Sequence, residues 1–254
     1  MQHQPPTNAV SRPLVRGGIA ALCLVLGAGL GSAIGWRAAM HRSAAQRTLP
    51  VLFKAPAYRD LLNQNGDKVS SQAFDGKVQV VAFLFPYCNT FCPVIAAHLV
   101  GFENLLASSG LADKVDVVSF NVDPGGTGPR QMREFLQEYG WDASNPRWQY
   151  LTGTPAQIRS VVTSGFHVDY QKVMDQGSAG DSSSAALAVA GSDPQPQVVN
   201  PLATKADVPY DITHEDVLML VDQRGRVRAI YDQADAVGKF ELLKAVRSLL
   251  GTTG

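Results

Sequence analysis

Two apolar runs separated by a helical segment restrict the fold of this chain more than any other feature. Val78–Phe85 and Val115–Phe120 each have the length of one strand, and their near-continuous apolar sequence predicts strands buried on both faces. Between them, Pro93–Ser108 has helical spacing, and one side of that helix would carry Ile95, Leu99, Phe102 and Leu106. The pattern predicts a sheet covered by helices.

The flanking segments continue the alternation of strands and helices. The sequence Asn65–Lys68 predicts the turn of a short edge hairpin, and Asp222–Gly225 predicts a second hairpin turn. The remaining expected elements are helices at 129–139, 155–164 and 237–250, and strands at 147–151, 217–221 and 227–231. The predicted fold class is therefore α/β, with a mixed sheet flanked by helices.

An uncharged segment near the N-terminus predicts a transmembrane anchor. Residues 17–36 form a run of 20 without a charge, and Arg16 and Arg37 bound it. As a helix this run would span about 30 Å, whereas the apolar region of the alternative, a cleaved signal peptide, is usually about 7–15 residues long. We therefore divide the chain into a short tail at 1–16, an anchor at 17–36, a tether at 37–56 and a folded domain at 57–254.

The anchor also bears on topology and association. A short tail before a long domain indicates a single-pass anchor with its N-terminus inside, because long domains translocate largely regardless of their charge. Gly27, Gly31 and Gly35 recur at four-residue spacing, which would let two anchors pack closely as a homodimer. Glycine is also common in membrane helices without such packing, so both interpretations stay open.

One segment departs from the composition of the predicted domain. Residues 176–208 contain no aromatic residue and are rich in Ser, Ala, Gly, Pro and Gln. A segment of this composition does not bury enough apolar surface to order itself. We expect a flexible surface insertion.

The charge balance argues against nucleic acid as a partner. The chain has 22 basic and 22 acidic residues, so its formal net charge is zero. Nucleic-acid binding depends on excess positive charge, and the aromatic residues here are not interleaved with a basic patch. We expect no nucleic-acid partner.

Two cysteines lie where the first buried strand meets the following helix. Cys88 and Cys92 are separated by three residues, and Pro93 follows at once. A thiol at this junction faces the positive end of the helix, which stabilises the thiolate form. Thiolates attack disulfides and bind soft metal ions, so the pair predicts redox or metal chemistry; a plain structural disulfide is the alternative.

The spacing of the pair bears on that choice. A C-x-x-C pair before a helix is typical of thiol–disulfide exchange, and C-x-x-x-C adds a residue that would let both sulfurs point at one ion. Zinc prefers four ligands, whereas copper(I) accepts two or three soft donors. Among the five histidines, His98 would face away from Cys92 on the helix, and His214 precedes a buried strand where a loop could lie over the cysteines.

Several segments together resemble the Sco/SenC family of copper-binding proteins. The sequence from Phe83 to Pro93 resembles the family's C-x-x-x-C-P motif. Four other segments agree in order, namely Phe74–Lys77, Ser119–Pro124, Leu151–Pro155 and Leu220–Arg226. The resemblance extends over about residues 58–250.

The resemblance implies a thioredoxin-like fold and a specific role. It places the anchor in the inner (cytoplasmic) membrane and the soluble domain in the periplasm. Cys88, Cys92 and His214 match the family's copper ligands. The role implied is a copper chaperone for the CuA centre of cytochrome c oxidase, whose copper-bearing subunit, or another copper protein, would be the partner.

Two sequence differences separate this chain from the family pattern. The residues between the cysteines (Asn89, Thr90, Phe91) include no acidic side chain, and Thr213 stands where the family often has Asp before the histidine.

The alternative to a metallochaperone is an enzyme, a thiol–disulfide oxidoreductase in which Cys88 and Cys92 form the redox-active pair and His214 is dispensable. A cysteine peroxidase, with Thr90 as the nearest threonine, and a non-catalytic tethered module are further alternatives.

Overall fold

A computed structural model of the chain describes residues 49–174 and 210–252. The predicted tail and anchor, most of the tether and the expected insertion at 176–208 lie outside these residues. Within the described residues, no helix combines the length and the apolar character needed to cross a membrane.

The core of the domain is a mixed six-stranded sheet with strand order β1-β10-β9-β4-β5-β6. Its strands are β1 (Phe53–Lys54), β4 (Val78–Leu84), β5 (Val115–Asn121), β6 (Trp148–Leu151), β9 (Leu218–Val221) and β10 (Arg226–Tyr231). Strands β4, β5 and β6 are parallel to one another, while β9 and β10 run antiparallel to their neighbours. The predicted mixed α/β sheet is confirmed, with β4 and β5 at its centre.

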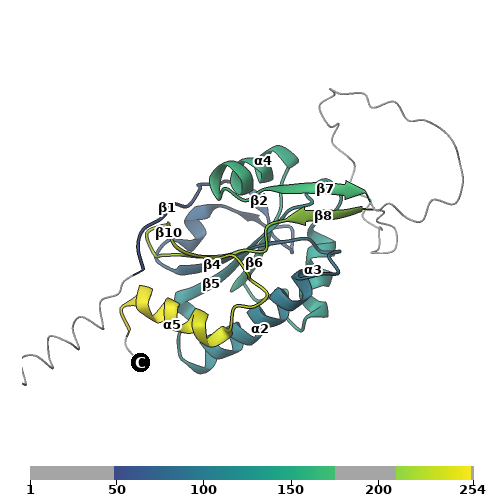
Figure 1. Ribbon diagram of the computed structural model, residues 1–254. Coiled ribbons are helices and arrows are strands. Elements are labelled where there is room, and N and C mark those ends of the chain that lie inside the picture. The colour runs from purple at the N-terminus through teal and green to yellow at the C-terminus, as the bar shows by residue number, and fades with distance from the viewer. Residues whose placement is uncertain (1–48, 175–209, 253–254) are drawn as a thin grey trace, which may run out of the picture. The chain divides into compact units, whose positions relative to one another are not determined.

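Helices cover both faces of the sheet. They are α2 (Cys92–Ser108), α3 (Pro129–Glu138), α4 (Pro155–Arg159) and α5 (Lys239–Leu250), together with short turns η1 (Ser71–Phe74), η2 (Ala112–Lys114) and the π-helical η3 (Ser160–Gly165). Helices α2 and α5 lie together on one face, and α4 lies on the opposite face (Figure 1). The helix predicted at 155–164 is thus an α-helix for only one turn and continues as a π-helix.

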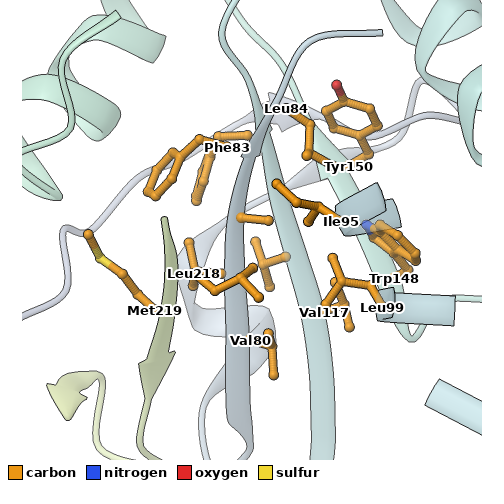
Figure 2. Packing of buried hydrophobic residues seen from close by; sticks show 14 of the residues in the cluster. Val80, Phe83, Leu84, Ile95, Leu99, Val117, Trp148, Tyr150, Leu218 and Met219 are labelled. Atoms are coloured by element: carbon orange, nitrogen blue, oxygen red, sulfur yellow. The ribbon is translucent and has the colours of Figure 1, made fainter. Parts of the chain in front are cut away.

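The buried face of α2 carries the side chains that the helical spacing predicts. Ile95, Leu99, Phe102 and Leu106 are each at most 1% exposed. In the sheet, Phe83 and Leu84 point to opposite faces, as successive residues of a strand must, and Leu84 lies on the side of Ile95 (Figure 2). The central strands are therefore buried on both faces, as their continuous apolar sequence requires.

Two small antiparallel sheets complete the domain. The expected hairpin around Asn65–Lys68 is present as β2 (Leu61–Leu62) and β3 (Lys68–Val69), separate from the main sheet. The second pair is β7 (Tyr170–Met174) and β8 (Tyr210–His214), and the expected insertion lies between these two strands in the sequence. Residues 53–54, which we assigned to the tether, instead form β1 because they pair with β10.

Candidate metal centre

The cysteine pair lies between the carboxyl end of β4 and the first residue of α2. A turn follows β4, in which the Cys88 N–H donates to the Phe85 carbonyl at 3.0 Å. Helix α2 begins at Cys92, and Pro93 lies in its first turn, where a missing backbone N–H costs no hydrogen bond. No disulfide joins Cys88 and Cys92, and the two residues are 3% and 0% exposed. The predicted position at the strand–helix junction is confirmed.

The two sulfurs differ in protonation. The hydrogen bond from the Cys92 thiol, helped by the Thr90 hydroxyl 3.2 Å from Cys88 Sγ, lowers the pKa of Cys88 to about 5. Burial raises the pKa of Cys92 well above its usual value. At neutral pH the pair therefore holds one thiolate, on Cys88, and one thiol, on Cys92. We expected the helix terminus to favour thiolate in general, but at Cys92 desolvation outweighs it.

His214 reaches the pair from a segment 122 residues further along the chain. Its Nε2 lies 3.6 Å from Cys92 Sγ. We expected a loop here; instead His214 is the last residue of β8, paired with Tyr170 of β7. Strand pairing, rather than a loop, therefore sets the direction of the imidazole.

The protonation of His214 follows from its surroundings. The Nδ1 atom lies 3.0 Å from the Glu215 carbonyl oxygen, which only accepts, so Nδ1 carries the hydrogen. Burial lowers the pKa of His214, which keeps the ring neutral. The Nε2 lone pair therefore faces Cys92 Sγ as an acceptor. A backbone carbonyl that fixes the tautomer in this way is typical of metal-binding histidines.

An aromatic ring closes the histidine side of the centre. Phe91, between the cysteines, packs edge-on against His214 with ring centroids 4.9 Å apart at 74°. His214 is accordingly only 8% exposed. The apolar cover keeps water from the donor atoms and favours neutral imidazole.

The donor set fits a soft metal ion. Cys92 contacts both Cys88 and His214, which brings two sulfurs and one imidazole nitrogen into a continuous row. In the part of the chain that the structure describes, no three His, Cys, Asp or Glu side chains are already arranged as a metal-ligand group. A thiolate, a thiol that loses its proton on binding and a neutral imidazole suit copper(I) better than zinc, which seeks a fourth ligand.

The other histidines that the structure describes do not join the centre. His98 is half-buried on α2, and His167 is exposed, with its ring against Phe53 at 5.2 Å. His167 takes a φ of 62° in the loop before β7. His3 and His41 lie outside the described residues.

Sequence reasoning missed one residue beside the sulfurs and two residues that hold the strand of His214. Thr90 entered only as a candidate for peroxidase chemistry, yet its hydroxyl contacts Cys88. The position of Thr90 between the two cysteines in the sequence could have indicated this contact. Tyr210 and Asp123, which hold the strand that carries His214, gave no local signal because they are 87 residues apart.

Comparison with known proteins gives a family match and several similar curated proteins. The SCO1/SenC family model matches residues 55–208, more than half of the chain, and this match ends before His214. The "SCO1 protein homolog" of Bacillus subtilis is 34% identical over 91 residues, 36% of this chain and 45% of that protein. A SCO2-like protein of Rickettsia prowazekii is 27% identical over 116 residues, 45% of this chain and 52% of that protein. The matched parts span about half the length of these relatives.

Solved structures agree in fold. The copper-bound ScoI of Bradyrhizobium japonicum superimposes with a TM-score of 0.55 at 20% identity, over 77% of this chain and 99% of that one. BsSco is described as a member of the Sco family of cytochrome c oxidase assembly proteins with a disulfide switch. It superimposes with a TM-score of 0.56 at 22% identity, over 82% of this chain and 100% of that one. The thioredoxin-like fold implied by the resemblance is confirmed. By the extent of the family match, this chain belongs to the SCO1/SenC family.

Proposed function

We propose that the protein is a membrane-anchored copper chaperone that delivers copper to the CuA centre during cytochrome c oxidase assembly. The observation that carries this proposal is the row of buried donors, with Cys92 in contact with both Cys88 and His214. Family membership supports it, and solved relatives contain copper.

The residues of the centre would divide the work of holding copper. Cys88, already a thiolate, supplies the first anionic sulfur without a proton leaving. Cys92 must lose its proton on binding, which makes affinity depend on pH. His214 supplies a neutral nitrogen whose direction is fixed by the Glu215 carbonyl. Copper held this way is cargo, so a weak third ligand next to two sulfurs would favour its release to a partner.

The cellular setting is part of the same proposal. A single-pass helix at 17–36 would hold the domain in the periplasm at the inner membrane, next to the copper-bearing oxidase subunit. The partner is that subunit or another copper protein, and paired anchors would give a homodimer. Nucleic acid has no part in this scheme.

Copper loading of the full-length chain tests the ligand assignment. The reduced protein, purified in detergent and loaded with copper(I), should hold one copper per chain by elemental analysis. Cys88→Ala, Cys92→Ala and His214→Ala should each lower the copper(I) affinity measured against a chromogenic chelator, while His98→Ala, a change at a histidine outside the centre, should not. Unchanged affinity in His214→Ala would contradict the three-ligand centre.

A second candidate, thiol–disulfide exchange, draws on the unequal sulfurs. A thiolate of pKa about 5 beside a buried thiol is the arrangement of an attacking and a resolving cysteine. Oxidation to a disulfide would use the same sulfurs and so exclude copper. In that case Cys92→Ala should trap a mixed disulfide with the client through Cys88, and His214→Ala should leave this trapping unchanged.

A further inference from the structure

We propose that Asp123 is a positioning residue of the metal centre, whose carboxylate holds the β7–β8 hairpin so that His214 meets the cysteine pair. The inference rests on the proposed function for its copper readout. It concerns a residue that lies outside the row of donors, in the segment that follows β5.

The hairpin that carries His214 is not part of the main sheet. Strands β7 and β8 hydrogen-bond to each other and form a separate two-stranded sheet. His214 lies at one end of this pair, opposite Tyr170, and Tyr210 lies at the other end, opposite Met174. The position of the imidazole therefore depends on side chains that attach the hairpin to the rest of the domain.

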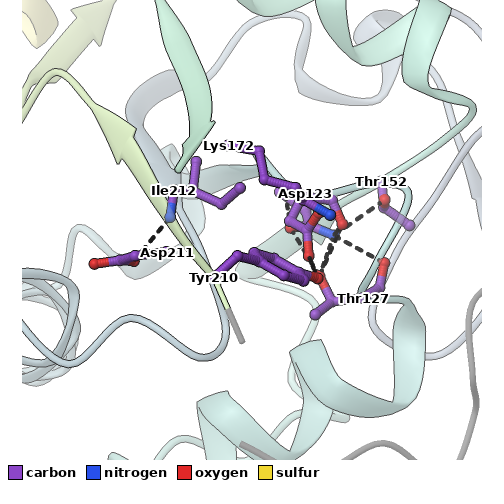
Figure 3. Close-up of polar contacts among 8 residues, drawn as sticks. Asp123, Thr127, Thr152, Lys172, Tyr210, Asp211 and Ile212 are labelled. Carbon is purple, nitrogen blue, oxygen red and sulfur yellow. Dashed lines mark hydrogen bonds and ion pairs between the residues drawn. The ribbon is translucent and has the colours of Figure 1, made fainter. Parts of the chain in front are cut away.

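Asp123 binds both strands of the hairpin. The Tyr210 hydroxyl of β8 donates to one carboxylate oxygen at 2.7 Å, and Lys172 Nζ of β7 lies 3.6 Å from the other. Lys172 Nζ also lies 3.5 Å from the centroid of the Tyr210 ring. Figure 3 shows Lys172 and Tyr210 converging on Asp123. One carboxylate thus contacts both strands of the hairpin, which among the described residues pair only with each other.

The backbone of Asp123 is held by hydrogen bonds at the end of β5. Asp123 follows β5, is 3% exposed, and its N–H donates to the Asn121 side chain at 3.0 Å. Its carbonyl accepts from the Thr127 hydroxyl at 3.0 Å, and Asn121 in turn donates to Thr152 at 3.3 Å (Figure 3). Asp123 therefore fixes the hairpin relative to β5 and to Thr152, which follows β6.

The alternation of β8 connects this attachment to His214. Tyr210, Ile212 and His214 share one face of the strand, and Ile212 and His214 are buried while Thr213 between them is exposed. The Tyr210 ring also stacks on Phe85 with centroids 6.1 Å apart, and the Phe85 carbonyl accepts the Cys88 N–H. Tyr210 thereby contacts Asp123, which holds the hairpin, and Phe85, which begins the turn that carries Cys88.

A neighbouring glycine provides an independent test of the same contact. A methyl group at Gly126 would overlap both the Tyr210 hydroxyl and the Asp123 carboxylate, whereas one at Gly125 would meet nothing within 4 Å. Neither glycine has a positive φ. Gly126→Ala should displace Tyr210 without removing a functional group, and Gly125→Ala is its matched control.

The experiment compares Tyr210→Phe, Gly126→Ala and Gly125→Ala in the full-length chain in detergent. In the metal-free protein, the amides of β7 and β8 should exchange hydrogen roughly 10–100-fold faster in the first two variants, as loss of a hydrogen bond to a charged group implies. Copper(I) affinity should fall by about 10–100-fold, as for other groups that orient a ligand. Gly125→Ala should match the wild type in both.

A double-mutant cycle separates positioning from general destabilisation. If Asp123 acts through His214, Tyr210→Phe should weaken copper binding in the wild-type chain and cause no further loss in His214→Ala. Equal losses in both backgrounds, or unchanged exchange in both Tyr210→Phe and Gly126→Ala, would overturn the inference. If the wild type binds no copper, the proposed function fails, and the exchange measurement alone decides whether Asp123 holds the hairpin.

Discussion

Replacing Cys92 by alanine should raise the pKa of Cys88. The largest influence that lowers this pKa to about 5 is the hydrogen bond from the Cys92 thiol, and alanine removes that donor. A hydrogen bond to a charged group contributes about 1.5–3 kcal/mol, which corresponds to about 1–2 pH units. The Thr90 hydroxyl and the backbone N–H groups remain, so the pKa should settle at about 6–7 rather than at its ordinary value of 9.0.

Thiolate absorbance in the ultraviolet measures this change directly. The reduced, metal-free wild type should show one thiolate per chain appearing with a midpoint near pH 5, and Cys88→Ala should abolish that step. Cys92→Ser is the matched control, because its hydroxyl still donates and should leave a smaller shift than alanine. A Cys92→Ala midpoint that stays near 5 would refute the role of the Cys92 hydrogen bond, and a wild-type midpoint near 9 would refute the stabilised thiolate itself.

Three further predictions concern stability. Burial raises the pKa of Glu103 to about 7 from 4.5, so the folded chain binds this proton more tightly than the unfolded chain. The free energy of unfolding should therefore fall by about 3 kcal/mol as pH rises from 4.5 to 7. Glu103→Gln should remove that pH dependence in denaturant titrations. Burial opposes ionisation of Asp222, but hydrogen bonds from two arginines lower its pKa to about 2 from 3.8. About 2 kcal/mol of folding stability, present above pH 3.8, should therefore be lost as pH falls to 2. Asp222→Asn should abolish this acid-sensitive part of the stability. Leu99→Ala, at a fully buried site, should cost about 2–5 kcal/mol by thermal unfolding, and a loss equal to that of Phe240→Ala, at a site 68% exposed, would contradict the packing.

Local sequence patterns were sufficient for the elements that form the centre of the sheet. Near-continuous apolar sequence predicted β4 and β5, because strands buried on both faces carry apolar side chains at most positions. The spacing of Leu99 and its neighbours predicted the buried face of α2, since helical periodicity is set within a few residues. The position of Cys88 and Cys92 at the junction followed from these two elements.

The residues that complete the centre required the tertiary structure. His214 was predicted mainly by family resemblance and was expected in a loop, whereas strand pairing with β7 directs it to Cys92. The unequal protonation of the cysteines depends on burial, which is a property of the packed domain. The attachment of Tyr210 to Asp123 joins residues 87 apart. The sequence by itself determined the two central strands, helix α2 and the place of the two sulfurs, because those depend on neighbouring residues. The third donor and its support depend on long-range packing, which only the folded chain decides.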